Sequence, residues 1–373
     1  MALVTTAMAF GLRAGMLNQW GTEFALTVEQ LGWISSTAFW GFTLAMIFGG
    51  PLCDVIGMKR LLYIAFGGHF LGIVLTIFST GFWPLYISTL FIGVGNGMVE
   101  AACNPLVATI HSGEKTKMLN RLHMWFPGGI VIGGLAGYFM GNMGLSWQIQ
   151  VSIMLIPTAA YGYLFFSEKF PVTERVTSGV STGDMFKACA APLFIFMVIC
   201  MLITASTELG TGQLIGTFLG NTGVAPILVL VFINGLMMIG RSFAGNIVHS
   251  LSPAGMLLFS AIFSAIGMTW LSYAQGLVPT FAAATVFGMG ICFFWPTMIS
   301  FVSEYLPKTG ALGMSIMGGS GMLSVAIVLP ILGRFLDNQP GDVTLRYFAL
   351  LPAFLVLAFG GLYIYSRKLK TSH

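Results

Sequence analysis

Charged residues are scarce in this chain. Only 8% of its 373 residues are Asp, Glu, Lys or Arg, whereas a soluble domain usually carries about a quarter. So few charges leave too little polar surface to cover a water-soluble globule of this length. Apolar residues make up 56% of the chain. They recur in blocks of roughly 20, the length that crosses the hydrocarbon core of a bilayer. The composition therefore predicts an all-α membrane protein.

Motifs of enzymes and cofactor-binding proteins are also missing. The chain has no G-x-x-x-x-G-K-[ST] nucleotide-binding loop, and its five scattered histidines form no H-E-x-x-H or comparable metal cluster. The five cysteines show no paired spacing, so we interpret them as small core residues and expect no disulfide, metal or other cofactor. No basic block is long enough to follow a phosphate backbone, which argues against nucleic acid as a partner. An enzyme is disfavoured, and a sensor would lack a soluble domain to report binding.

The apolar blocks predict twelve transmembrane helices in two six-helix bundles. The spans lie near 1–20, 30–53, 60–80, 83–110, 123–141, 147–167, 188–217, 224–248, 254–274, 278–304, 310–334 and 345–367. The longest polar connection, a cytoplasmic linker at 168–187, separates the bundle at 1–167 from the bundle at 188–373. The first residues lack the charged leader and cleavage site of a signal peptide. We expect the first helix to begin at Met1, and a short cytoplasmic tail to precede it in the full protein.

Lysine and arginine are concentrated in alternate loops. If the N-terminus is inside, the inner loops and tail hold most of the bases, from Lys59 and Arg60 to Lys368 and Lys370. The outer loops then hold mainly acids, flanked only by Arg334 and Arg346 among the bases. Positively charged loops stay in the cytoplasm. Both termini are therefore expected on the cytoplasmic side of an inner (plasma) membrane.

A charged loop follows the second predicted span. Residues 50–60 match the pattern G-x-x-x-D-[RK]-x-G-x-[RK]-[RK] at Gly50, Asp54, Gly57, Lys59 and Arg60, and depart from it only at Val55. Gly50 permits close helix packing and Gly57 a tight turn, while Asp54 is placed to pair with a base when the cytoplasmic side is shut. This motif and the six-plus-six layout resemble the major facilitator superfamily. The resemblance implies a solute site near the midplane, between two halves that rock.

Three charged residues fall inside predicted spans: Arg13, Glu100 and Glu208. A charge at a helix centre costs about 2.5–3.5 kcal/mol on insertion scales, so each one needs a partner, a cavity or a function. We expect Arg13 to pair with Glu100; the alternatives are that Arg13 binds an anionic solute or extends to a membrane surface. Arg241, close to the inner face, is interpreted as a gate or boundary residue.

The fourth span carries polar residues at helical spacing. Asn96, Glu100 and Asn104 are four apart, so we expect them on one face that lines a central cavity. The run Glu100-x-x-x-Asn104-Pro105 resembles the fucose permease-like sugar transporters, as does the region 120–128, which includes His123 and Trp125. The resemblance implies sugar handling. That group carries an acid after Leu-Asn in the first helix, where this chain has Gln19, so a relay through two carboxylates is not implied.

Glu208 is the acidic residue of the seventh span. Thr204 and Thr211 share its helical face. If the two halves are repeats, the first, fourth, seventh and tenth helices occupy equivalent positions around the cavity. The alternative is that neighbouring hydroxyls satisfy Glu208 near the outer end. In the tenth span, Trp295 precedes a proline and is expected to form an aromatic wall against which a sugar packs.

These patterns lead to one main hypothesis, the secondary active uptake of a small polar solute by alternating access. A monosaccharide or small glycoside fits best, with possible coupling to H⁺ or Na⁺ through Glu100 and Arg13. The partners are then the solute, the ion and membrane lipid, and the protein is expected to be a monomer. The expected solute-binding residues are Asn18, Gln19, Trp20, Asn96, Glu100, Asn104, His123, Trp125, Glu208, Gln213 and Trp295. The alternative is an exporter of an amphiphile, lipid or drug, which would need a more apolar cavity.

Overall fold

The computed structural model describes residues 1–111, 115–172, 182–219 and 223–371. The described residues are 88% helical and contain no strand. The N-terminal part forms α1 (Ala2–Glu23), α2 (Val28–Ile56), α3 (Met58–Ile77), α4 (Phe82–Ile110), α5 (Lys115–His123), α6 (Trp125–Asn142), α7 (Trp147–Ser152) and α8 (Leu155–Ser167). We call this part the N-half.

The C-terminal part, which we call the C-half, follows the same all-helical pattern. It contains α10 (Thr182–Cys189), α11 (Pro192–Ala205), a π-helix (Ser206–Gly210), α12 (Thr211–Gln213), α13 (Ile215–Phe218), α14 (Pro226–Ser242), α15 (Ala244–Tyr273), α16 (Leu277–Ile291), α17 (Phe294–Tyr305), a 3₁₀ turn (Pro307–Thr309), α18 (Gly310–Asn338), α19 (Gly341–Phe348) and α20 (Leu350–Thr371). Several of these elements join into longer runs.

Ten helical runs of the described chain are long and apolar enough to cross a membrane. They begin with Val28–Cys53 and end with Gly341–Ser366. The helix Pro226–Ser242 is also apolar but shorter, with 17 residues, and α1 has 22 residues. The membrane-spanning, all-α prediction is thereby confirmed. The count of twelve spans and the cytoplasmic position of the termini remain predictions.

Local sequence explains where α2 begins and ends. Thr27 and Gln30 form a capping box, in which the Thr27 hydroxyl accepts from the Gln30 N–H at 3.1 Å and the Gln30 side chain accepts from the Thr27 N–H at 2.9 Å. At the other end, Gly57 has a φ of 86°, a conformation that glycine adopts without strain. This glycine makes the tight turn into α3 that the sequence predicted.

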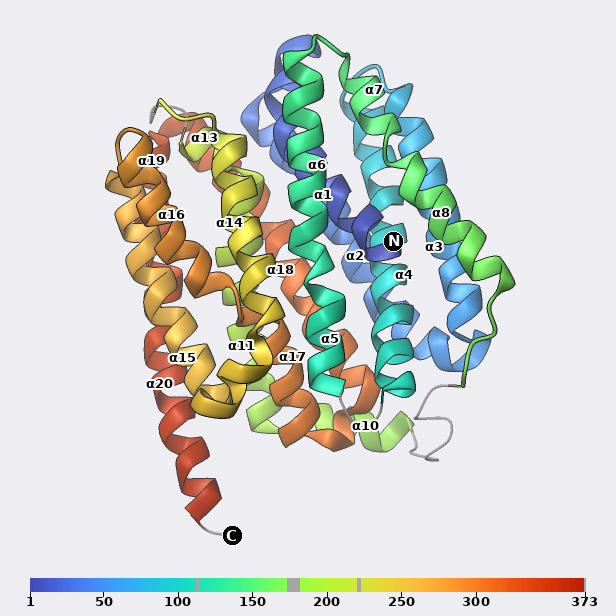
Figure 1. Cartoon of the computed structure of the whole chain (residues 1–373), viewed down its shortest axis with the longest axis vertical. Coiled ribbons are helices and arrows are strands. Elements are labelled where there is room, and N and C mark those ends of the chain that lie inside the picture. The colour runs from blue at the N-terminus through green and yellow to red at the C-terminus, as the bar shows by residue number, and fades with distance from the viewer. Residues whose placement is uncertain (112–114, 173–181, 220–222, 372–373) are drawn as a thin grey trace.

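The two halves lie side by side and meet along two helix pairs (Figure 1). α2 of the N-half packs against α18 of the C-half, and α6 packs against α14. Glycines permit the close approach at both ends of the α2–α18 pair. A Cβ on Gly32 would lie 3.0 Å from the Leu329 carbonyl oxygen, and one on Gly50 would lie 2.5 Å from the Ser315 Oγ. The halves are therefore in contact at both ends of α2.

Candidate functional site

A buried polar chain runs from α4 to the end of α5. Glu100 is 2% exposed, and its Oε2 accepts a hydrogen bond from the Asn104 Nδ2 at 3.4 Å. The Asn104 Oδ1 lies 3.1 Å from the Nε2 of buried His123. The spacing of four on α4 places the carboxylate and the amide one turn apart. Three residues that the sequence nominated are thus brought together.

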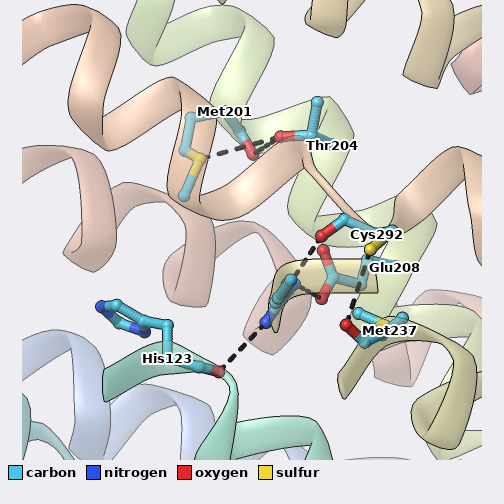
Figure 2. Close-up of polar contacts among 7 residues, drawn as sticks. His123, Met201, Thr204, Glu208, Met237 and Cys292 are labelled. Carbon is cyan, nitrogen blue, oxygen red and sulfur yellow. Dashed lines mark hydrogen bonds and ion pairs between the residues drawn. The ribbon is translucent and has the colours of Figure 1, made fainter. Parts of the chain in front are cut away.

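A second buried polar group lies in the C-half, where α14 faces the π-helix. The Arg241 Nη2 is 3.1 Å from the Glu208 Oε1, and both side chains are almost fully buried. Arg241 also donates through Nε to the Cys292 carbonyl oxygen at 2.8 Å. Its Nη1 donates to the His123 carbonyl oxygen of the N-half at 3.4 Å (Figure 2). Arg241 therefore contacts both halves, and the interpretation of this residue as a gate or boundary residue remains a prediction.

Both polar groups border the same cavity, which has about 250 Å³ of empty space, including space open to solvent. The N-half contributes Glu100 and His123 to its lining, and the C-half contributes Glu208, Arg241 and Trp295. Phe126, Leu209 and Met322 complete the wall. A neighbouring cavity of about 440 Å³ shares Glu208 and extends towards Thr211, Gln213 and Asn234. The lining thus combines charged groups, hydroxyl or amide groups and one indole ring.

Arg13 does not pair with Glu100, so this expectation was wrong. Its Nε and Nη2 donate to the Gln213 Oε1 of the C-half at 3.2 and 2.8 Å. The guanidinium also lies over the rings of Phe10, at 4.9 Å, and Phe39, at 5.7 Å. The reason is the direction of the side chain, which leaves α1 towards α12 and not towards α4. Among the described residues, Arg13 has no carboxylate partner.

Asn96 also lies outside this group. Its Oδ1 is 2.8 Å from the Nε2 of His69 on α3, whose Nδ1 is in turn 2.8 Å from the Tyr161 hydroxyl. Successive positions four apart on a helix are offset by about 40°, so Asn96 and Asn104 differ by about 80°. That drift directs Asn96 into the N-half interior, while Asn104 bonds to Glu100 and His123.

The remaining nominated residues are spread over the molecule. Trp20 is buried against Trp147, with ring centroids 5.9 Å apart and the rings nearly perpendicular. Asn18 and Gln19 are exposed, and Trp125 is 42% exposed at the start of α6. None of these four lines either cavity described above. Gln213 and Trp295 do line a cavity, as the sequence predicted.

The loop motif after α2 makes contacts within the N-half. Lys59 donates through Nζ to the carbonyl oxygens of Phe166, at 3.0 Å, and Glu168, at 2.8 Å, which lie at the end of α8. Arg60 is exposed. The side chain of Asp54 lies outside the described residues, so its pairing in a closed gate remains a prediction.

Comparison with known proteins identifies the family. The model of the Major Facilitator Superfamily matches residues 1–327. The chain belongs to the major facilitator superfamily. This family is one of transporters and not of enzymes.

Individual transport proteins resemble parts of the chain. The D-xylose transporter of Levilactobacillus brevis is 26% identical over 131 residues, which is 35% of this chain and 29% of that protein. The cis,cis-muconate transport protein of Acinetobacter baylyi is 29% identical over 162 residues, or 42% and 38% of the two chains. The chain therefore matches well under half of the length of these relatives.

A solved structure shows the fold over nearly the whole chain. The fucose:proton symporter of Escherichia coli superposes with a TM-score of 0.68 at 17% identity, over 96% of this chain and 97% of that one. The major facilitator fold is thereby confirmed, together with the resemblance to fucose permeases. At this level of identity, the likeness concerns the fold.

Arg241 lines the cavity, although the sequence analysis did not include it among the solute-binding residues. The sequence suggested a gate or boundary residue, and in the structure the Arg241 guanidinium pairs with the Glu208 carboxylate. The sequence contained a signal, because a proline stands four residues after each residue whose carbonyl Arg241 contacts. Pro127 follows His123, and Pro296 follows Cys292. Among the described residues, no group of three His, Cys, Asp or Glu side chains could hold a metal ion.

Proposed function

We propose that the protein is a secondary active transporter that takes up a small hydroxyl-bearing solute, with a monosaccharide or small glycoside as the best fit. The two halves are the six-helix bundles that rock about the central cavity, with twelve spans and both termini in the cytoplasm. The superfamily membership and the sugar transporters among its relatives and fold neighbours support this assignment.

The observation that carries the proposal is the mixed lining of the cavity between the halves. Carboxylate, imidazole, guanidinium and indole groups come from both halves and surround one space between them. Sugars are bound by such sets, because polar groups bond their hydroxyls and an aromatic face packs against their C–H surface. A cavity for an apolar drug would not need four buried polar side chains.

Glu100 is the group best placed to couple transport to H⁺ or Na⁺. It borders the cavity, it is buried, and its bond to Asn104 is long at 3.4 Å. By contrast, Glu208 is tied to Arg241 in an ion pair. A carboxylate without a strong basic partner is free to take up a cation when the cavity opens to one side of the membrane and to release it when the cavity opens to the other side.

Counterflow in proteoliposomes tests the function directly. Purified protein is reconstituted into vesicles loaded with one unlabelled sugar at a time, and entry of the same labelled sugar is measured. We expect exchange with at least one monosaccharide or glycoside, and no exchange in vesicles that lack the protein. If a broad panel of neutral sugars and sugar acids gives no exchange, the proposal is wrong.

A second candidate solute class is a small carboxylate, such as a sugar acid. Arginine keeps its positive charge in proteins, and a buried cation without a counter-ion is costly. Arg13 is 4% exposed and is held by a neutral amide, so a solute carboxylate could replace the Gln213 oxygen on it. The transport protein for muconate, a dicarboxylate, is one of the relatives.

The Arg13→Gln variant separates the two solute classes. If the solute is a carboxylate, this variant should lose exchange of acids by at least about tenfold, the effect of one lost charge-assisted bond. If the solute is neutral, exchange of the sugar should persist. The wild-type protein, assayed with each sugar and its acid, is the control.

A further inference from the structure

Two helix carbonyls near the cavity lack their usual donors because prolines follow them. In an α-helix, the carbonyl of one residue accepts from the N–H four residues later. Proline has no N–H, so Pro127 leaves the His123 carbonyl without this bond and Pro296 does the same for Cys292. The first carbonyl belongs to the N-half, where α5 gives way to α6. The second lies in the C-half, where α16 gives way to α17.

Arg241 supplies a donor to both carbonyls. Its Nε reaches the Cys292 oxygen at 2.8 Å, and its Nη1 reaches the His123 oxygen at 3.4 Å. Its third contact is with Glu208, within the π-helix that interrupts the α11 run. Three breaks in regular helices thus converge on one guanidinium, whose rigid fork can serve several acceptors at once.

We propose that Arg241 is a positioning residue that latches the N-half onto the C-half when the cavity is closed. Glu208 and Cys292 anchor the guanidinium within its own half through two short contacts. Among the acceptors of Arg241 in the described residues, only the His123 carbonyl lies across the interface, and this contact is the longest of the three. Rocking of the halves therefore breaks this bond and leaves the other two intact. The proposal rests on the proposed transport function.

The two prolines make the latch testable with a matched pair of variants. Pro127→Ala restores an N–H that competes for the His123 carbonyl, so it should weaken the contact across the interface. Pro296→Ala restores the corresponding N–H for Cys292, so it changes only a contact within the C-half. Both variants replace a helix proline by the same residue, and both leave Arg241 and Glu208 in place.

Closure of the cavity is measured by crosslinking the N-half to the C-half close to Arg241. The Ser242 Oγ lies 3.7 Å from the Met124 Sδ, so these residues face each other from the two halves. Met124→Cys and Ser242→Cys are introduced together into a background in which the five native cysteines are alanine. The yield with a short bifunctional thiol reagent reports the closed fraction. We expect Pro127→Ala to lower the closed-to-open ratio by about two- to tenfold, the effect of one hydrogen bond.

The control variants fix the interpretation of the crosslinking. Pro296→Ala should leave the yield unchanged, whereas Arg241→Lys should lower it, because an ammonium cannot span three acceptors. Equal yields in all variants, or equal losses in both proline variants, would overturn the latch. Thermal unfolding checks that each variant is folded.

A failure of the latch is distinguishable from a failure of the transport function. The crosslinking needs no solute and is done on the protein in lipid vesicles. Sugar counterflow by the same background protein is measured in parallel. Absence of exchange with every solute would reject the transport proposal, whereas exchange together with insensitive crosslinking would reject the latch alone.

Discussion

Replacing Glu100 with glutamine should uncouple transport without unfolding the protein. Glutamine has nearly the same shape and keeps a carbonyl oxygen that can accept from the Asn104 amide. The bond replaced is 3.4 Å long, so the change in the free energy of unfolding should stay below about 1 kcal/mol. What the variant loses is the carboxylate that would carry a cation beside the solute.

The expected loss of accumulation follows from the membrane potential. One positive charge that crosses with the solute gains about 2.3 kcal/mol per 100 mV, which supports roughly a fortyfold concentration ratio. Without that charge, the solute should only equilibrate, so the ratio should fall to about one. Exchange at equal concentrations should decrease far less, because the other cavity groups remain.

Uptake and counterflow in the same vesicles check this prediction. Accumulation is driven by an imposed potential and pH gradient, with and without sodium, and is compared with exchange in their absence. Asn104→Asp, which adds a carboxylate one turn away, serves as a partner variant and should restore part of the accumulation in the Glu100→Gln background. Normal accumulation by Glu100→Gln alone would refute the coupling role.

Three further predictions concern the ion pair, the helix packing and the topology. Glu208→Gln leaves the Arg241 charge buried and should destabilise the protein by about 3–5 kcal/mol, whereas Arg241→Gln in the same chain should recover much of the loss in thermal unfolding. Gly93→Ala places a methyl 2.3 Å from the Ala38 carbonyl oxygen and should lower the yield of folded protein, while Gly67→Ala, with no described atom within 4 Å, should not. A reporter protein that is active only in the cytoplasm should be active when it is fused to the C-terminus, because the C-terminus is expected on the cytoplasmic side.

The fold could be predicted from the sequence because its main signals are local. The length of an apolar segment predicts a transmembrane helix without any information about the other helices. Ten of the predicted spans have counterparts among the long helices of the described chain. The turn at Gly57 was also predictable, since the motif places a glycine where the backbone reverses. The contacts of Glu100 and Asn104 follow from spacing on a single helix.

The partners of the two buried arginines could not be predicted in this way. The bond from Arg13 to Gln213 joins residues 200 positions apart, and composition gives no preference for Gln213 over Glu100. Asn96 was misplaced for a different reason, because a spacing of four drifts around the helix. The π-helix at Ser206–Gly210 is a local change of pitch that helical periodicity does not reveal.

The two arginines cross the interface in opposite directions. Arg13 reaches from the N-half to a side chain of the C-half, and Arg241 reaches from the C-half to the backbone of the N-half. Each acceptor across the interface is neutral, while the strong ion pair with Glu208 stays within one half. Neutral acceptors make each crossing contact worth only about 0.5–3 kcal/mol. Bound solute can supply differences of that size between two states, so the joint can hold the cavity closed and still open during each transport cycle.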